Sequence, residues 1–551
     1  MKKHLTLIFI VSLLIGLSTF VMGQARTSTN PYPFYQPADH VYQYMVKAGG
    51  RNVYLWIPPH CSKVKGALVS LSNLLERQWL EDSLIRHTAA DIGLAIIWIG
   101  PANNGDKSFT ADMKPGMEII FQQMMDELAD ESGYAELKKA PVIAMGHSAN
   151  GQFAWTFANA FPDRTIAVIP IKTIPPPDSL RFSNIPFCYI VGETTEWPQY
   201  RVPDPATKPG DRDFYWPIVH KAALALRSQN PDNLVGVVTD PGGGHFDWSP
   251  HLTQFVALYI RKACRYRLPD QGQSTLKPIT KTSGWLTGNG GMDKDKYKYA
   301  LAPYALFKGP VNEGYWFFDK ETATAAVDFE GDRIKRKKQM PTFIQDGQLV
   351  PVAKLGYAVL KFEPDADGVS FHLQGGFLPQ LPPELIGAGE TLGHSSGAIT
   401  FRVITGPAIQ TGPNSFRLQF DRAGMGGELW IQETQVEDSE YRHAVQPGMI
   451  RIPAKLTAGK PQEIKFAKIP DLKKTTTSVS LQAVSNSGLP VSYYVVAGPA
   501  YVENNHLIIT PVPVESKYPV KVTVVAYQWG RVTDELFQSA APVEQTFNIY
   551  R

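Results

Sequence analysis

The sequence predicts an α/β protein with a mostly parallel β-sheet in its N-terminal half, followed by all-β sandwich domains. Between about residues 40 and 265, apolar strand-like segments alternate with helix-like segments, which is the pattern of a parallel sheet covered on both faces. Beyond residue 270 the chain changes to polar segments and strands that alternate with period two, as in β-sandwiches. The 551 residues, 43% hydrophobic and 19% charged, are ample for more than one core.

The first 23 residues have the organisation of a secretory signal peptide. Lys2 and Lys3 precede an apolar run over residues 5–17, and Val21-Met22-Gly23 supplies small residues at a cleavage point. The run is short for a membrane span, so a retained anchor is the less favoured alternative. We therefore expect an exported protein, periplasmic or extracellular, without a stable membrane anchor.

Charge and cysteine content exclude several classes of protein. A formal net charge of +3 favours no role in binding nucleic acid. The three cysteines are too few for a disulfide scaffold and are not spaced as metal ligands. Cys188 is expected to be a small core residue, while pairing of Cys61 with Cys264 stays open. Neither a metal nor an organic cofactor is implied.

The elements of the predicted sheet follow one another in a regular order. Residues 40–47 and 52–58, joined by Gly49-Gly50, predict a hairpin. Apolar strands are expected at residues 67–71, 94–99, 142–145, 166–171, 187–191 and 234–238, with helices that include residues 117–128, 220–226 and 252–264.

Two stretches contain Gly-His-Ser, and they differ in their surroundings. Gly393-His394-Ser395-Ser396-Gly397 matches the serine-hydrolase pattern G-x-S-x-G, but it lies in a glycine-rich loop before an alternating strand. Ser148 has Asn150 where the last glycine belongs, yet a buried strand precedes it and a helical pattern follows it. The pattern works only at a sharp strand-to-helix turn, so Ser148 is the better candidate nucleophile.

With its hairpin start, its elbow after the fifth strand and a histidine after the last strand, the segment of residues 40–265 resembles the α/β-hydrolase family. The resemblance implies a nucleophile, an acid and a histidine in that order along the chain. His245 follows the last strand behind Gly242-Gly243-Gly244, and an imidazole can take up and return a proton near neutral pH.

The acid of the implied triad departs from the family pattern. Family members place an Asp shortly after the strand that here ends near Val191, but this chain has Thr195 there. Glu196 is the preferred acid because its longer side chain can bridge the offset, and Glu193 is the alternative.

The resemblance also implies an oxyanion hole built from backbone amides. Ala149, after the nucleophile, supplies the first donor, and Leu74 or Asn73, in the loop after the third strand, supplies the second. Asn150 needs more room than glycine, and Gly151 is expected to supply it. Trp197 and Trp248 are candidate substrate contacts because aromatic faces stack on sugars and aryl groups. Residues 196–213, without clear periodicity, form a candidate lid.

Three regions are expected after the signal peptide of residues 1–23. Residues 24–270 form the catalytic domain, residues 271–468 form a mainly β-sandwich domain with an irregular start and one helix near residues 317–329, and residues 469–551 form a separate module. This last module resembles the immunoglobulin-like modules of secreted bacterial enzymes.

Together these features predict a secreted serine hydrolase. The favoured activity is carboxylic ester hydrolysis on an esterified carbohydrate or another extracellular polymer, through a Ser-His-Glu triad and an acyl-enzyme. Two alternatives stay open: a secreted serine peptidase with the same triad, and an inactive hydrolase-like binding protein.

Overall fold

The computed structural model describes residues 37–177, 180, 183–192, 215–240, 242–288, 299–352, 356–383 and 389–551. The predicted signal peptide therefore lies outside the described residues. Within the described residues, no helix is both long enough and apolar enough to cross a membrane. Cys61, Cys188 and Cys264 are all free thiols, so the pairing that the sequence left open does not form.

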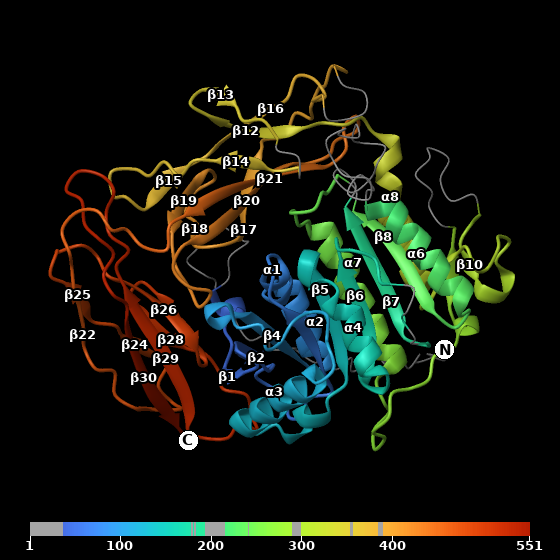
Figure 1. The fold of residues 1–551 in the computed structure, drawn as a ribbon, viewed down its shortest axis with the longest axis horizontal. Coiled ribbons are helices and arrows are strands. Elements are labelled where there is room, and N and C mark those ends of the chain that lie inside the picture. Colours follow the sequence, from blue (N-terminus) through green and yellow to red (C-terminus); the bar gives the residue numbers. More distant parts are fainter. Residues whose placement is uncertain are drawn as a thin grey trace, which may run out of the picture.

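The N-terminal half is built on one eight-stranded sheet (Figure 1). The strands are β1 (Tyr44–Ala48), β2 (Arg51–Trp56), β3 (Gly66–Leu71), β4 (Leu94–Ala102), β5 (Val142–His147), β6 (Thr165–Ile171), β7 (Pro186–Gly192) and β8 (Leu234–Asp240). Their order in the sheet is β1-β2-β4-β3-β5-β6-β7-β8. Strands β1 and β2 form the predicted hairpin, β2 runs antiparallel to β4, and β3 to β8 are parallel. The predicted α/β class is confirmed.

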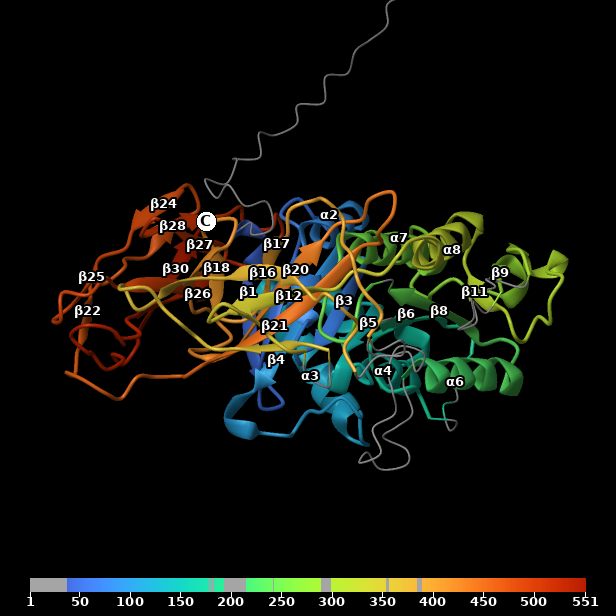
Figure 2. The ribbon, with the colours of Figure 1, turned by 90° about the horizontal axis from the view of Figure 1, so that it is seen from above.

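Helices cover both faces of this sheet. They are α1 (Glu76–Leu80), α2 (Ser83–Ile92), α3 (Met117–Ser132), α4 (Phe153–Ala160), α6 (Tyr215–Gln229) and α7 (Pro250–Arg267). Figure 2 shows α2 and α7 on one face and α3, α4 and α6 on the other. A sheet covered on two faces must be apolar on both, which explains why β3, β5, β6, β7 and β8 consist entirely of buried residues.

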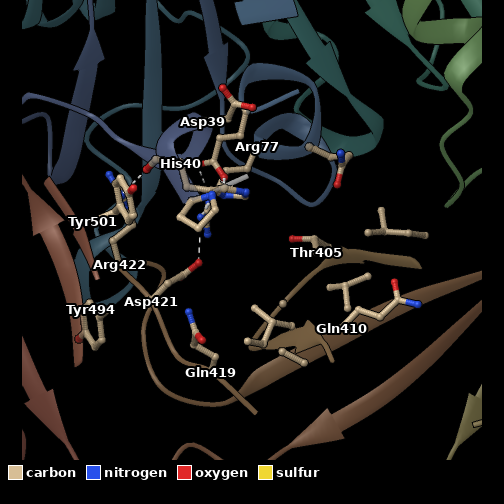
Figure 3. Close-up of a pocket in the computed structure, with 18 of the residues that line it drawn as sticks. Asp39, His40, Arg77, Thr405, Gln410, Gln419, Asp421, Arg422, Tyr494 and Tyr501 are labelled. Atoms are coloured by element: carbon tan, nitrogen blue, oxygen red, sulfur yellow. Dashed lines mark hydrogen bonds and ion pairs between the residues drawn. The ribbon is translucent and has the colours of Figure 1, made fainter. Parts of the chain in front are cut away.

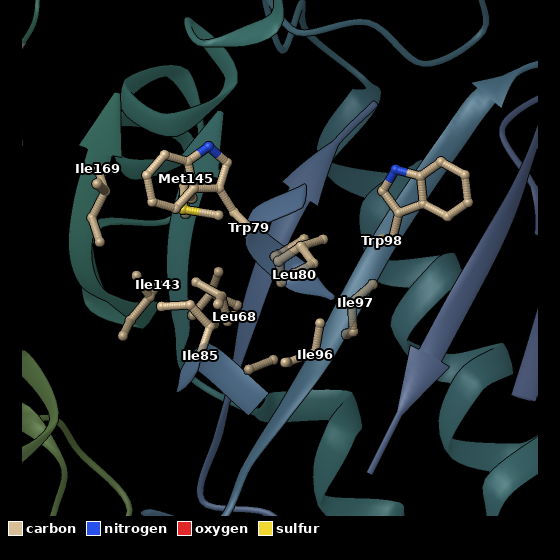
Figure 4. Packing of buried hydrophobic residues seen from close by; sticks show 14 of the residues in the cluster. Leu68, Trp79, Leu80, Ile85, Ile96, Ile97, Trp98, Ile143, Met145 and Ile169 are labelled. Carbon is tan, nitrogen blue, oxygen red and sulfur yellow. The ribbon is translucent and has the colours of Figure 1, made fainter. Parts of the chain in front are cut away.

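The core of this half lies between the central strands and the helices. In Figure 4, Leu68 of β3, Ile96 of β4 and Ile143 of β5 face Leu80 and Ile85 from the helices. All five side chains are buried, with at most 1% of their surface exposed. Burial of such side chains contributes about 1.5–3 kcal/mol each, so this layer stabilises the packing of the helices on the central strands.

Residues 285–335 extend the large sheet's domain. They form β9 (Trp285–Thr287), β10 (Ala302–Pro303), β11 (Tyr315–Phe317) and helix α8 (Lys320–Lys335), which contains the predicted helix. The β11 backbone lies so close to β8 that a Cβ added at Gly236 would be 2.9 Å from the carbonyl oxygen of Trp316. Phe329 of α8 stacks on Phe255 of α7, with ring centres 6.0 Å apart. The segment thus packs on the α/β core, and a domain boundary at residue 270 stays a prediction.

In the rest of the described chain, the regular elements are strands in several small sheets. The first group comprises β12 (Pro341–Gln345), β13 (Gln348–Leu349), β14 (Ala358–Leu360), β15 (Ser370–His372), β16 (Gln374–Phe377), β17 (Thr400–Thr405), β18 (Ala408–Gln410), β19 (Ser415–Leu418), β20 (Gly427–Gln435) and β21 (Ala444–Ile452). These strands form the sheets β14-β21-β20-β17, β15-β19-β18 and β13-β12-β16. They enclose a second core that includes Phe371, Phe416 and Ile431. We call residues 336–452 the middle β-region.

The final group of strands forms what we call the C-terminal β-region, residues 464–550. It comprises β22 (Ile464–Phe466), β23 (Leu472–Lys473), β24 (Ser478–Ser480), β25 (Ala483–Ser485), β26 (Ser492–Ala497), β27 (Ala500–Glu503), β28 (His506–Ile509), β29 (Val520–Tyr527) and β30 (Val543–Tyr550). The main sheets are β23-β30-β29-β26 and β24-β28-β27. Its likeness to an immunoglobulin-like module stays a prediction.

Both β-regions pack against the α/β domain (Figure 1). The middle region clamps Trp248: Gln432 donates to the Trp248 carbonyl at 2.8 Å and accepts from the Trp248 amide at 2.8 Å. The C-terminal region is joined through the Gly498 amide, which donates to the carbonyl of Tyr42 at 2.9 Å, and the Lys517 amide, which donates to that of Ser132 at 2.9 Å. The chain therefore closes on itself, with its last part beside its first.

The Gln432 clamp gives a test of this packing. Gln432→Leu keeps the side-chain volume similar but leaves the buried Trp248 amide and carbonyl without their partner. We expect the free energy of unfolding, measured by denaturant titration of the full chain, to fall by about 1–3 kcal/mol for each unpaired group. Gln348→Leu on the exposed strand β13 is the control and should change it by less than about 0.5 kcal/mol. An equal fall in the free energy of unfolding in both variants would contradict a stabilising role for the hydrogen bonds between Gln432 and Trp248.

Candidate active site

Ser148 lies at a sharp turn between β5 and α4. Its φ of 53° falls in the left-handed region, which is costly for a residue with a side chain. Gly146 makes the turn possible, because a Cβ there would lie 2.6 Å from the carbonyl oxygen of Asn150. The turn is therefore the strained strand-to-helix elbow that the sequence around Ser148 predicted.

Asn150 fits this elbow and also ties it to a neighbouring loop. Its side-chain amide donates to the carbonyl of Ser72, which follows β3. The close approach that usually requires glycine occurs one residue later, at Gly151, where a Cβ would lie 2.5 Å from the Cβ of Thr173. The departure from G-x-S-x-G is thus accommodated by Gly151, as predicted, and Asn150 gains a structural role.

His245 reaches Ser148 from the loop after β8. Its Nε2 lies 2.8 Å from the Ser148 Oγ, within hydrogen-bond distance. The neighbouring His147 has its Nε2 2.9 Å from the main-chain oxygen of His245, so it donates to that carbonyl. Burial lowers the pKa of His147 well below its usual value, which keeps this ring neutral. His147 therefore fixes the backbone that presents the His245 imidazole.

A buried ion cluster closes the His245 loop at both ends. Lys172, at the end of β6, donates to Asp240 at 3.0 Å and binds Asp247, and all three side chains are at most 2% exposed. Asp247 also accepts a hydrogen bond from the Gly244 amide. Burial raises the pKa of Asp247 to about 6, although Lys172 opposes this. One ammonium group thus links the first and last parts of the loop around His245.

The predicted acids lie outside the described residues, as do Trp197 and the candidate lid over residues 196–213. The structure does place the point from which the chain continues to them. Gly192, the last residue of β7, is so close to Gly244 that a Cβ there would overlap the Gly244 carbonyl. The two carboxylates in the His245 loop, Asp240 and Asp247, are both bound to Lys172. Neither carboxylate is therefore the favoured candidate for the acid that orients His245.

The loop after β3 carries a feature that the sequence did not predict. The Glu76 carboxylate accepts hydrogen bonds from the amides of Leu74 at 2.7 Å, Asn73 at 2.8 Å and His147 at 3.1 Å. The Leu74 amide, predicted to be the second oxyanion donor, is instead bound to Glu76. The other predicted donor, Ala149, is exposed beside Ser148, and its amide has no hydrogen-bond partner within the described part of the chain.

Burial dominates the titration of Glu76. The residue is 1% exposed, and burial raises the pKa of its carboxyl group from 4.5 to about 7, while the amide hydrogen bonds lower it by less. Glu76 connects the loop after β3 to the strand that carries Ser148. No motif in the sequence marks this role, because it depends on a contact between residues 71 positions apart.

Trp248, predicted to bind substrate, is packed into the contact with the middle β-region. Its side chain is 5% exposed, and the Arg402 guanidinium lies 3.5 Å from the ring centre. Phe246, next to His245, stacks on Trp430 of β20 with ring centres 4.5 Å apart. Phe246 and Trp248 thus both contact the middle β-region, and a role of Trp248 in substrate binding stays a prediction.

Ser395 is a structural residue. It is 1% exposed, donates to the carbonyl of Val436 at 2.8 Å and accepts from the Gln435 amide at 2.7 Å. His394 stacks on Phe377 with ring centres 3.8 Å apart, and its Nδ1 lies 2.9 Å from the Ser395 main-chain oxygen. The perfect G-x-S-x-G match therefore belongs to a turn in the middle β-region, and of the two Gly-His-Ser serines it is Ser148 whose hydroxyl contacts a histidine from another loop.

The strand order and the elbow define an α/β-hydrolase fold. No protein-family model matches the sequence, and no curated protein is similar to it. Among solved structures, a poly(3-hydroxybutyrate) depolymerase from Bordetella parapertussis has 13% identity over 43% of this chain and 97% of its own, at a TM-score of 0.29. An S-formylglutathione hydrolase from Agrobacterium tumefaciens has 14% identity over 40% and 93%, at 0.28. Est1E from Butyrivibrio proteoclasticus has 14% identity over 40% and 96%, at 0.25.

The raised pKa of Glu76 predicts a pH-dependent stability. A carboxyl group whose pKa rises from 4.5 to about 7 on folding stabilises the protein fully below pH 4.5, and this contribution is lost as the pH rises through 7. The free energy of unfolding of the wild type, relative to Glu76→Gln, should therefore fall by roughly 3 kcal/mol between pH 4.5 and 7.5. Asp247 titrates in both proteins and cancels in the difference. A difference that grows with pH would show that the amide hydrogen bonds prevail over burial.

The ion cluster around Lys172 gives a second test. Lys172→Met leaves two buried carboxylates without their cation, and we expect the free energy of unfolding to fall by about 3–5 kcal/mol. Adding Asp240→Asn and Asp247→Asn to that variant should recover part of the loss. The control is Lys138→Met, which removes an exposed ion pair with Asp130 and should cost less than about 1 kcal/mol. A similar loss in both single variants would contradict the role of the cluster.

Proposed function

We propose that the protein is a secreted serine hydrolase, a carboxylic ester hydrolase that acts on an esterified carbohydrate or another extracellular polymer. The observation that carries the proposal is the 2.8 Å separation of Ser148 Oγ and His245 Nε2, with Ser148 at a strained φ of 53°. A hydroxyl held against an imidazole in this way can be deprotonated as it attacks a carbonyl carbon. Export is supported by the composition of residues 1–23 alone.

The reaction would proceed in two balanced steps. Ser148 Oγ bonds to the ester carbonyl carbon, His245 takes the hydroxyl proton, and the alcohol leaves with that proton to give an acyl-enzyme. Water then gives a proton to His245 and attacks the acyl carbon, the bond to Ser148 breaks, and the acid is released as Oγ regains the proton. The Ala149 amide would stabilise the negative oxygen in both steps.

A carboxylate is needed to orient His245 and to stabilise its protonated form. Because Asp240 and Asp247 are bound to Lys172, and the chain leaves β7 beside Gly244, we assign this role to Glu196, with Glu193 as the alternative. Glutamine variants distinguish them: the true acid should lose most of the hydrolytic rate, and the other glutamate should not.

A fluorophosphonate probe tests the nucleophile. The probe should label the wild type and Ser395→Ala but not Ser148→Ala, because the Ser148 hydroxyl lies at the elbow within hydrogen-bond distance of His245, whereas Ser395 is buried and bonded to Val436. His245→Ala should slow the hydrolysis of p-nitrophenyl acetate at least about a thousandfold. Absence of labelling in the wild type would favour an inactive binding protein. Release of amines from casein, without release of acetate or ferulate from esterified xylan, would favour a peptidase.

A further inference from the structure

A cavity of about 320 Å³ lies where the α/β domain and both β-regions meet. It is lined from three directions. The α/β domain contributes residues 77–78 and 81–84, Trp248 and residues near His40, the middle β-region contributes residues 402–406, 408–410 and 419–422, and the C-terminal β-region contributes residues 493–495 and 500–502. Neither Ser148 nor His245 lines it. Its size is that of a small-molecule pocket, and its walls exist only when all three parts of the chain are together.

The wall carries charges of both signs that nearly balance: Arg77, Arg402 and Arg422 lie on it together with Asp39, Glu81, Asp82 and Asp421. The Arg77 guanidinium pairs with Glu81 at 2.9 Å and with Asp421 at 2.8 Å, and His40 contacts the same Glu81 carboxylate. Asp39 accepts a hydrogen bond from Ser83, and Asp82 caps α2 by accepting from the Leu84 amide at 2.9 Å. A ligand in this cavity would thus meet positive and negative groups in nearly equal number, which favours a neutral molecule over an ion.

Three polar side chains on the wall are available to such a ligand. Thr405, Gln419 and Tyr494 line the cavity and make no side-chain hydrogen bond within the described part of the chain. Figure 3 shows Thr405 and Gln419 with their polar ends toward the space below His40 and Arg77. Together they offer two hydroxyls, one amide donor group and one amide carbonyl, while the Tyr494 ring adds a flat apolar face.

A second cavity adjoins this one on the side of the loop that follows β3. This second cavity, of about 290 Å³, is lined by Ser72, Leu74 and Glu76 and shares Arg77, Thr405 and Asp421 with the first. The Arg77–Asp421 ion pair lies on the wall of both. The two cavities therefore adjoin, and the second borders the loop that is bonded to the end of β5 just before Ser148.

We propose that the three-way cavity binds a neutral sugar unit of the polymer chain whose ester is presented to Ser148. A sugar ring has several hydroxyls that can both donate and accept, which fits the uncommitted hydroxyl and amide groups, and a less polar face that fits an aromatic ring. The inference rests on the proposed function for its link to ester hydrolysis. The saccharide binding itself depends only on the cavity.

Binding can be measured without turnover in the full-length Ser148→Ala protein. The probes are neutral arabinoxylan, glucomannan and mixed-linkage β-glucan in native affinity gels, with polygalacturonate as the acidic contrast. We expect at least one neutral polymer to retard the protein, and polygalacturonate not to. Adding Gln419→Ala, Thr405→Val or Tyr494→Phe should weaken binding about fivefold to tenfold each, as expected for loss of one hydrogen bond.

Matched controls are Gln348→Ala and Tyr550→Phe, which lie at exposed positions away from the cavity and should bind as Ser148→Ala does. Thermal unfolding checks that each variant is folded. The inference is overturned if no neutral polymer retards the protein, if only polygalacturonate does, or if the cavity variants bind like the controls. Hydrolysis of p-nitrophenyl acetate by the wild type without saccharide binding would overturn this inference and leave the proposed function. Saccharide binding without any esterase activity would support this inference and overturn the proposed function.

Discussion

The ammonium group of Lys172 is buried, and a buried charge persists only with partners. Its partners are Asp240, at the end of β8, and Asp247, two residues beyond His245. Both ends of the loop between Asp240 and Asp247 bind the Lys172 ammonium group. This restrains the loop even though it contains three successive glycines. The position of His245, and with it the contact to Ser148, depends on this cluster.

The middle β-region also bears on the catalytic pair. Phe246 and Trp248, on either side of Asp247, are held by Trp430, Gln432 and Arg402. The loop therefore has an ionic anchor inside the α/β domain and an aromatic anchor outside it. Phe246 is the residue next to His245. A shift of the middle β-region relative to the α/β domain would therefore move Phe246 and, with it, His245.

How much the sequence could predict depended on the range of the interactions. The elbow at Ser148 and the glycine-linked His245 are local patterns, a strand followed by a turn, and they were predicted together with the parallel sheet. Glu76 and Lys172 are not marked by any local pattern, because their partners are 71 and 75 residues away. The Leu74 amide, the predicted second oxyanion donor, binds Glu76 instead, and in this case the partner is only two residues away.

The hydrogen bond from Gly498 to Tyr42 joins the C-terminal β-region to the start of the described chain. During synthesis, the surface around Tyr42 therefore stays uncovered until the C-terminal β-region has been made. The main-chain carbonyls of Tyr42 and Ser132 lack their protein donors until then, and water can bond to them. Tyr493 and Val495 of the C-terminal β-region belong to the same buried cluster as Tyr42, so the late closure also buries apolar surface, which favours it.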